Sequence, residues 1–456
     1  LELDRLEADI LGRQKRRISV FVHGGLVTLN KSTESSQRIA RAMRNSSADI
    51  YPVFLNWETG LSRTYGRHLI SDDAGVPYDE NQLSLARSTL MGGLNVIGDL
   101  GMGVSRLPVN AVRASARLME RHREVPRIAP NAYPEKYSFS RKLDERLGVH
   151  YLDYRGGKND QAEIFTKGFA KPYSKARKEF RFHVGLGPDR IPAHSVRDVT
   201  TLLWTPMKAA TLTLSEGVGR GAWDNMVLRS RLLVHGHGEF FQRPPSSQER
   251  SDQWTKRGPG LEVIDRLNKL AKRRGLTLEL YGHSMGALVI NGIIDELARP
   301  GKENELNLKR LVYMAAACRI NDFRQTAGRY VESTRTPFYN LCLHPTQEVR
   351  ESLLNDAGSP LIAGSLLTWI DATFERPPSF GDRTLGTYMN AVLGESLLPK
   401  GPHVTLKGFG ADAKRSHHSG YGPQKHGQFN DYHFWNERFL DSKIHTGFDK
   451  LLIPGN

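Results

Sequence analysis

Cysteine is scarce in this sequence. Among its 456 residues only Cys318 and Cys342 are cysteines, and each lies in an apolar stretch. This placement predicts two buried thiols and argues against a disulfide framework. No spacing of cysteine and histidine is typical of a zinc site, so we expect neither a metal nor another cofactor.

Long apolar runs are absent as well. No stretch of about 18 uncharged apolar residues occurs, which argues against a membrane-spanning helix. The first residues, LELDRLEADILGRQKRR, lack the apolar core of a signal peptide. We therefore expect a cytoplasmic protein, for which peripheral contact with a membrane stays open.

Acidic side chains are too few to balance the basic ones. The chain has 64 Lys and Arg against 49 Asp and Glu, a formal net charge of +15. Such an excess favours an acidic partner, either nucleic acid or anionic lipid head groups, although a merely basic surface explains it equally well. No dense run of Lys and Arg interleaved with aromatic residues occurs, so nucleic acid is not the expected partner.

The chain divides into three zones. Residues 1–60 contain two short apolar runs, ISVFVHGG and DIYPVFLNW, on either side of a helical segment. Residues 61–260 follow an irregular pattern, and residues 261–456 return to apolar runs that alternate with amphipathic segments. We therefore expect an α/β fold with a mostly parallel sheet from the first and last zones. The middle zone would be a long, partly helical insertion.

Individual elements follow from the periodicity of apolar residues. Val263, Leu267 and Leu270 recur on one face of a helix that Gly275 ends. Strands are expected at 18–25, 49–57, 276–281, 309–318, 337–344 and 404–410, and helices at 32–44, 261–274 and 285–299.

The strongest chemical signal is the segment LELYGHSMGALVINGII, which places Ser284 between Gly282 and Gly286. A strand, then Gly-x-Ser-x-Gly, then a helix predicts a sharp turn that holds the serine hydroxyl at the end of the sheet. Glycines flank the serine because the turn brings backbone so close that a β-carbon would clash. An accessible Ser284 hydroxyl in such a turn is a candidate nucleophile.

A second glycine motif ends the first strong strand. The run VFVHGGL places His23, Gly24 and Gly25 at that point. The backbone N–H groups of Gly25 and Met285 would form an oxyanion hole there. The alternative interpretation is an ordinary glycine turn.

HGG after a strand, GHSMG between a strand and a helix, and a late histidine together resemble the α/β-hydrolase superfamily, in its esterase and lipase branch. The resemblance covers about residues 17–60 and 260–445. It implies Ser284 as nucleophile, Gly25 and Met285 as backbone donors, and an acid and a histidine downstream in that order. It also implies that residues 61–260 form a cap or lid.

The base is expected after the last strand, 404–410. We prefer His426, because Gly427 would permit a tight turn and the following FNDYHFWNERFL predicts a helix, which is where the family places its base. His433 would lie within that helix and is expected to be structural. The pair His417 and His418 is the remaining alternative.

The acid is the least constrained of the three. In most of the family it follows the strand that PFYNLCLH represents here, and the nearest carboxylate is Glu348. A place one strand earlier would select Asp322, and Glu348 would then be a first-turn helix carboxylate. Asp356, Asp371 and Asp382 also remain open.

These residues predict acyl transfer to water through an acyl-enzyme. We expect a serine hydrolase that acts on carboxylic esters. The apolar run at 90–112 and the positive charge favour a lipase at an anionic lipid surface, with a soluble carboxylesterase as alternative. A non-catalytic hydrolase-like binding protein and a basic nucleic-acid-binding protein are the two non-enzymatic alternatives.

Overall fold

The computed structural model describes the two outer zones of the chain and a short part of the middle one. The described residues are 2–25, 27–46, 48–57, 59, 222–235, 257–343, 347–348, 351, 365–374, 380–394, 397–410, 420–444 and 446–454.

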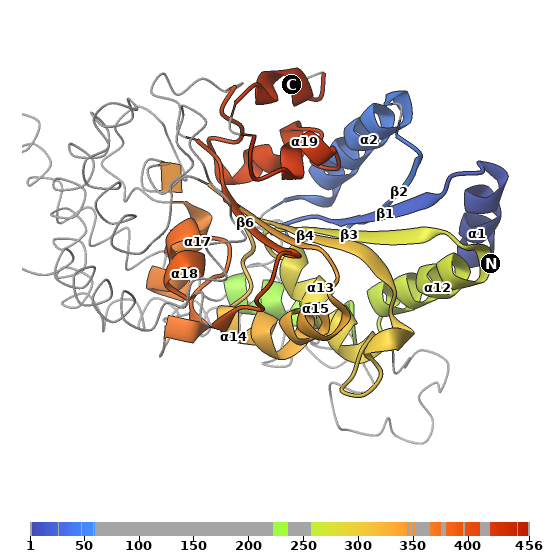
Figure 1. The fold of residues 1–456 in the computed structure, drawn as a ribbon, viewed down its shortest axis with the longest axis horizontal. Helices are drawn as coiled ribbons and strands as arrows, with labels where there is room; N and C mark the ends of the chain where they lie inside the picture. Colours follow the sequence, from blue (N-terminus) through green and yellow to red (C-terminus); the bar gives the residue numbers. More distant parts are fainter. Residues whose placement is uncertain are drawn as a thin grey trace, which may run out of the picture.

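Six parallel strands form one sheet in the order β2-β1-β3-β4-β5-β6 (Figure 1). They are β1 (Arg17–Val22), β2 (Ile50–Leu55), β3 (Thr277–His283), β4 (Leu308–Met314), β5 (Phe338–Cys342) and β6 (Val404–Gly408). Strand β1 pairs directly with β3, with Phe21 opposite Tyr281, so the first and third zones share one sheet. The predicted α/β class with a parallel sheet is confirmed. Because all strands run the same way, their carboxyl ends meet at one edge.

Helices cover both faces of this sheet (Figure 1). Helices α2 (Leu29–Asn45) and α19 (Glu437–Leu440) lie on one face, and α12 (Pro259–Arg274), α13 (Gly286–Leu297) and α15 (Arg329–Thr334) lie on the other. The three helices expected from periodicity are present, with slightly different ends. Further helices include α1 (Glu2–Gly12), α14 (Ile320–Phe323), α17 (Leu366–Trp369) and α18 (Tyr388–Leu393).

Local sequence explains where α12 begins and ends. Pro259 starts the helix, where its missing N–H group is not needed. Gly275 ends it in a left-handed conformation with φ 65°, which an L-residue with a side chain adopts only with strain. This geometry confirms Gly275 as the stop that leads into β3.

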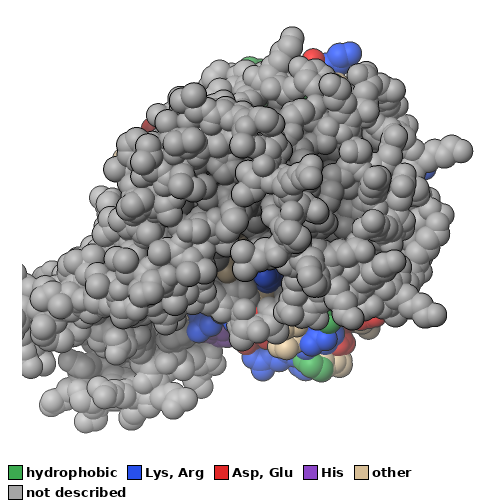
Figure 2. All heavy atoms as spheres, turned by 90° about the vertical axis from the view of Figure 1, so that its left-hand side faces the viewer, with side chains coloured by type: hydrophobic (Ala, Val, Ile, Leu, Met, Phe, Trp, Pro, Cys, Tyr) green, Lys and Arg blue, Asp and Glu red, His purple; other side chains and the backbone are tan. Residues whose placement is uncertain are grey.

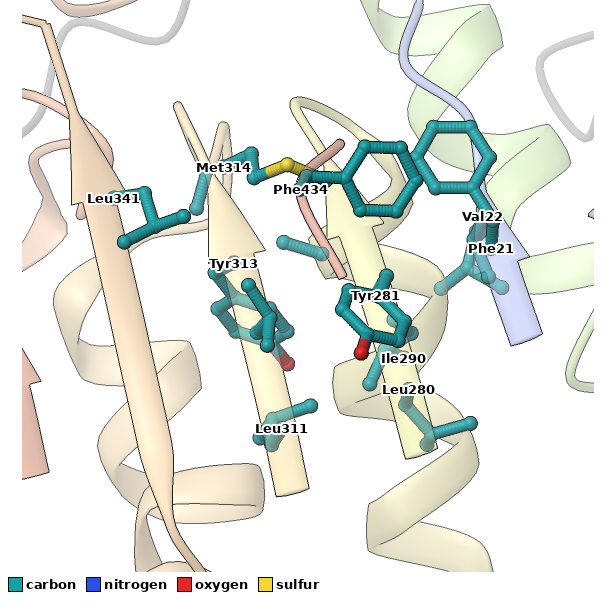
Figure 3. Packing of buried hydrophobic residues seen from close by; sticks show 14 of the residues in the cluster. Phe21, Val22, Leu280, Tyr281, Ile290, Leu311, Tyr313, Met314, Leu341 and Phe434 are labelled. Atoms are coloured by element: carbon teal, nitrogen blue, oxygen red, sulfur yellow. The ribbon is translucent and has the colours of Figure 1, made fainter. Parts of the chain in front are cut away.

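Aromatic residues fill the core between the sheet and its covering segments. The ring of Phe434 packs against Phe21 and Tyr281, with centroids 5.2 Å and 5.3 Å apart (Figure 3). Tyr313 meets Phe338 edge to face at 5.4 Å. Such pairs stabilise a core beyond the area that they bury. Cys318 and Cys342 are buried free thiols, as predicted.

A buried ion network lies within the sheet. The carboxylate of Glu279, which is fully buried, accepts hydrogen bonds from Arg17 at 3.1 Å and 3.0 Å, from Arg310 at 3.1 Å and from Ser19 at 2.9 Å. Tyr281 donates a further bond at 3.0 Å. Burial raises the pKa of Glu279, but Arg310 and Arg17 more than offset this and hold it below its usual value. The network joins β1, β3 and β4.

The described end of the middle zone packs onto this same core. Residues 222–232 are helical, and Trp223 and Met226 belong to the main cluster of buried residues. Trp223 stacks on Phe374 with ring centroids 6.3 Å apart. The predicted insertion at 61–260 therefore contributes to the core at its end, and its remainder lies almost wholly outside the described residues. None of the described helices has the length and apolar character that a membrane crossing requires.

Candidate active site

Ser284 occupies the turn between β3 and α13, within the segment that we call the serine turn (residues 282–286). Its φ of 52° is left-handed, which is uncommon for a residue with a side chain and strains the backbone by about 1–3 kcal/mol. Its N–H donates to Met314 O at 2.9 Å, and its carbonyl accepts from Ala317 N at 3.0 Å. The end of β4 therefore holds the turn in this strained form.

The glycines that flank Ser284 lie in close contact with neighbouring backbone, most closely at Gly286. A β-carbon on Gly286 would lie 2.1 Å from the carbonyl oxygen of Val22. A β-carbon on Gly282 would lie 3.0 Å from the Ala287 nitrogen. The clash predicted for a β-carbon in this turn is confirmed at Gly286, and at Gly282 the contact is tight.

The loop after β1 lies directly against the serine turn. A β-carbon on Gly24 would lie 2.7 Å from Cβ of Ser284, and one on Gly25 would lie 2.6 Å from Sδ of Met285. Neither Gly25 N–H nor Met285 N–H is a donor in the backbone hydrogen bonds found outside helices and strands of the described residues. Gly25 and Met285 are therefore neighbours, and neither amide is used in those backbone hydrogen bonds.

His23 anchors that loop. The Trp57 amide donates to Nε2 of His23 at 2.9 Å. Because Nε2 accepts, Nδ1 carries the ring proton, and it donates to the carbonyl of Gly24 at 2.7 Å. His23 is therefore a structural residue of the HGG motif.

The Ser284 hydroxyl is buried. The residue is 1% exposed, and its Oγ has no hydrogen-bond partner among the described residues. The expectation of an accessible hydroxyl is therefore wrong for this structure. A buried hydroxyl without a partner destabilises a fold, and a catalytic role is one explanation for such a group.

His426 lies beside the serine turn. It is the first residue of a 3-10 helix, η8 (His426–Asp431), and its carbonyl oxygen is 2.9 Å from Nε2 of His283. The rings of His283 and His426 have centroids 5.3 Å apart. Burial, and secondarily the nearby His283, lower the pKa of His426 well below the usual 6.5. The imidazole is therefore neutral near pH 7, as a general base must be.

Glu348, the preferred acid candidate, is buried in the structure. It is 4% exposed, its Oε2 accepts from Ser365 Oγ, and its carbonyl accepts from Ser365 N at 2.7 Å. Its Oε1 has no partner within the described part of the chain. Burial raises the pKa of Glu348 to about 8.

The neighbours of Glu348 hold the loop that carries His426. Glu351 accepts a hydrogen bond from His426 N at 2.9 Å. Gln347 Nε2 donates to Gln424 Oε1 at 2.8 Å. The acid segment, which we define as residues 347, 348 and 351, therefore lies beside the base loop, defined as residues 424–428.

The three candidate side chains are not hydrogen-bonded to one another in this structure. Ser284 Oγ, both ring nitrogens of His426 and Oε1 of Glu348 all lack partners among the described residues. The backbone around them is nonetheless joined, because the serine turn contacts His426 through His283 and the acid segment contacts it through Glu351.

The other acid candidates have different surroundings. Asp322 is exposed on α14. Asp382 accepts from Asn321 at 3.1 Å, and both carboxyl oxygens of Asp371 are bonded, to Thr384 N at 2.9 Å and Asn390 at 2.7 Å. Asp356 lies outside the described residues.

The other histidine candidates are less well placed. His417 and His418 lie outside the described residues. The single helix expected over 429–440 is wrong, because His433 lies outside any helix, between η8 and α19. Its N–H donates to Leu451 O at 2.7 Å, a tertiary bond that periodicity does not reveal.

The reason given for Gly427 also needs correction. No atom lies within 4 Å of a β-carbon built on it, and its φ is not left-handed. Gly427 sits in the first turn of η8, where any residue fits. His426 therefore owes its place to hydrogen bonds from other segments.

A scan against protein-family models, a search of curated proteins and a search of solved structures each returned no match. Within the described residues, no group of three or more His, Cys, Asp or Glu side chains could hold a metal ion.

Sequence reasoning missed four residues of this site. His283 adjoins Ser284 in the motif, and this adjacency was the one available signal. No sequence signal pointed to Glu351, Gln347 or Ser365, because their roles depend on contacts between segments far apart in the chain.

Proposed function

We propose that this protein is a serine hydrolase of the α/β-hydrolase type that cleaves carboxylic esters. The observation that carries the proposal is Ser284 itself, a residue with φ 52° at a strand-to-helix turn, with a buried hydroxyl that has no partner among the described residues. A side chain held in such strain is typical of a nucleophile. The strand order, with the serine after β3 and His426 after β6, supports the family resemblance.

The residues divide the chemistry of acyl transfer between them. Ser284 Oγ attacks the ester carbonyl carbon while His426 takes the hydroxyl proton, and the amides of Gly25 and Met285 bind the oxyanion. The leaving alcohol takes the proton from His426, and water then cleaves the acyl-enzyme by the same steps in reverse. Glu348 stabilises the imidazolium. Substrate binding draws these side chains into hydrogen-bond distance, as in other enzymes whose catalytic bonds form only in the complex.

A lipid ester is the substrate that the chain composition favours. The net charge of +15 would draw the protein to an anionic membrane surface, and residues 61–260 would act as the cap or lid of the acyl site. On the face shown in Figure 2, described Lys and Arg side chains lie beside Asp and Glu side chains at the lower edge. The proposed attraction to lipid therefore rests on the charge of the whole chain.

Hydrolysis of p-nitrophenyl esters of increasing acyl length, and of anionic phospholipid vesicles, tests this function. Ser284→Ala should abolish turnover. Ser230→Ala should not, because Ser230 is a buried serine whose hydroxyl bonds within its own helix, to Val227 O at 2.6 Å. Activity that rises with chain length and on vesicles supports a lipase, and activity confined to short esters supports a carboxylesterase.

Absence of turnover by the wild type on every ester would overturn the enzymatic proposal. A non-catalytic hydrolase-like binding protein would then be favoured. Binding of DNA or RNA that weakens steeply with salt would instead favour the nucleic-acid alternative.

A further inference from the structure

The backbone of His426 is held by side chains at both of its polar groups. Its carbonyl oxygen is 2.9 Å from Nε2 of His283, and its N–H donates to Oε2 of Glu351 at 2.9 Å. The two partners come from different sides of the site: His283 precedes the nucleophile candidate, and Glu351 belongs to the acid segment.

The hydrogen bond to the His426 carbonyl fixes the tautomer of His283. A carbonyl oxygen only accepts hydrogen bonds, so Nε2 of His283 carries the proton and donates. The opposite edge of the ring faces Gly24, where an added β-carbon would lie 3.0 Å from Nδ1. His283 is 5% exposed and fills the space between Gly24 and the base loop.

The Glu351 contact is reinforced by a parallel bond. Gln347 lies four residues earlier and binds Gln424, two residues before His426. Gln424 in turn donates to the carbonyl of Gly410 at 2.8 Å and accepts Gln347 through its other amide atom. The acid segment therefore holds the base loop through two hydrogen bonds, and a shift of the loop would break both.

The imidazole of His426 has no hydrogen bond of its own among the described residues. Its location is therefore set through its backbone and its packing. We propose that His283 and Glu351 are positioning residues that hold His426 between the serine turn and the acid segment, at the place where its ring can serve Ser284. This inference rests on the proposed function. A displacement of about 1 Å in a catalytic group lowers turnover by about 100-fold. Loss of either anchor, the His283 bond or the Glu351 bond, should therefore lower kcat strongly.

Paired substitutions at His283 separate the hydrogen bond from the packing. His283→Phe keeps a ring and removes the donor, and His283→Gln keeps an amide donor at the distance of Nε2. We expect His283→Phe to lower kcat by about 10- to 100-fold with KM changed by less than about twofold, and His283→Gln to restore most of the loss. His403→Phe is the matched control, because His403 lies just before β6, at the opposite end of that strand from the site.

The same design applies to Glu351. Glu351→Gln keeps an acceptor for His426 N–H and should keep kcat within about threefold of the wild type. Glu351→Leu removes the acceptor and should lower kcat by about tenfold or more. Because both anchors act on one residue, the double variant His283→Phe with Glu351→Leu should lose less than the product of the single losses.

A structural readout accompanies the kinetics. In the folded wild type, NMR should show the Nε2 proton of His283 shifted downfield, with a matching shift of the His426 carbonyl carbon. Both signals should be lost in His283→Phe and the carbonyl shift should return in His283→Gln.

Three results would overturn the inference. The first is equal kcat in the wild type and His283→Phe while the wild type hydrolyses esters, and the second is equal loss in His283→Phe and His283→Gln together with a matching loss of thermal stability. The third is an NMR spectrum without the hydrogen bond. A wild type inactive on every ester would instead remove the proposed function, and the inference with it.

Discussion

Gly24 approaches Ser284 so closely that a β-carbon added to Gly24 would lie 2.7 Å from Cβ of Ser284. Real β-carbons essentially never come this close to another atom, so the contact requires glycine. It joins the first zone of the chain to the third at the point where the proposed chemistry takes place. The proposed active site therefore depends on residues that the long middle zone separates in sequence.

Gly24→Ala is expected to damage the site more than the fold. The new methyl group would press on Ser284 and on Nδ1 of His283, at 3.0 Å, and push the HGG loop away from the serine turn. Ester hydrolysis should fall by about 100-fold, because a shift of about 1 Å misaligns both nucleophile and oxyanion donors. Gly427→Ala is the control, since its β-carbon meets no atom within 4 Å. Full activity in Gly24→Ala would contradict this account of the contact.

The pH dependence of hydrolysis should report His426. Burial first, and His283 second, lower its pKa well below 6.5, so the imidazole stays neutral and able to accept a proton in mildly acidic solution. In Glu348→Gln, where the neighbouring carboxyl no longer titrates, the acid limb of kcat/KM is therefore expected to have its midpoint below 6.5. A midpoint at or above the usual imidazole value would mean that a different, exposed histidine is the base.

Glu348→Gln should stabilise the fold and weaken catalysis. Burial raises the folded-state pKa of Glu348 to about 8, above the usual 4.5, so the folded protein binds this proton more tightly than the unfolded chain does. Its contribution to stability is complete below pH 4.5 and is lost as the pH rises toward about 8. Glutamine carries no such charge, so the variant should gain up to a few kcal/mol over the wild type across this window.

Urea unfolding at about pH 5 and about pH 8 measures that difference. Above about pH 8, where the wild-type Glu348 is ionised, ester hydrolysis by the same variant should fall by at least about tenfold, because the imidazolium loses its stabilising carboxylate. A variant that is less stable at the higher pH, or fully active, would remove Glu348 from the site.

Glu279→Gln should destabilise the fold and leave the activity of the folded protein unchanged. Removing the carboxylate leaves Arg17 and Arg310 without their shared partner in the sheet, which lowers the free energy of unfolding by about 3–5 kcal/mol. Because the pKa of Glu279 is held below 4.5, the wild-type network is complete above that pH and is lost as the pH falls below it. The specific activity of the folded fraction should stay near that of the wild type. Lost activity without lost stability would show that the network serves the site directly.

Much of the sheet could be predicted because short stretches of sequence encode its strands and the helices between them. Each strand is a short apolar run, and Pro259 and Gly275 mark the ends of α12 in the sequence itself. The Gly-x-Ser-x-Gly spacing likewise identified the turn, since its glycines are required by contacts within one strand–turn–helix unit and its neighbour β1.

The rest of the site depends on contacts that no local pattern encodes. His426 stood out only as one of several late histidines, and the bonds that fix it come from His283 and Glu351, far away in the chain. The helix expected beyond it is interrupted because His433 bonds to Leu451 instead of continuing the turn. Burial of Ser284 is equally a property of the assembled fold.

Treatment of the intact protein with a fluorophosphonate, followed by mass spectrometry of its peptides, shows whether Ser284 is the nucleophile. We expect one covalent adduct on Ser284, formed by the wild type and by Ser230→Ala, and slowed severely in His426→Ala. An unmodified Ser284 after prolonged exposure, or an adduct that forms equally well without His426, would contradict it.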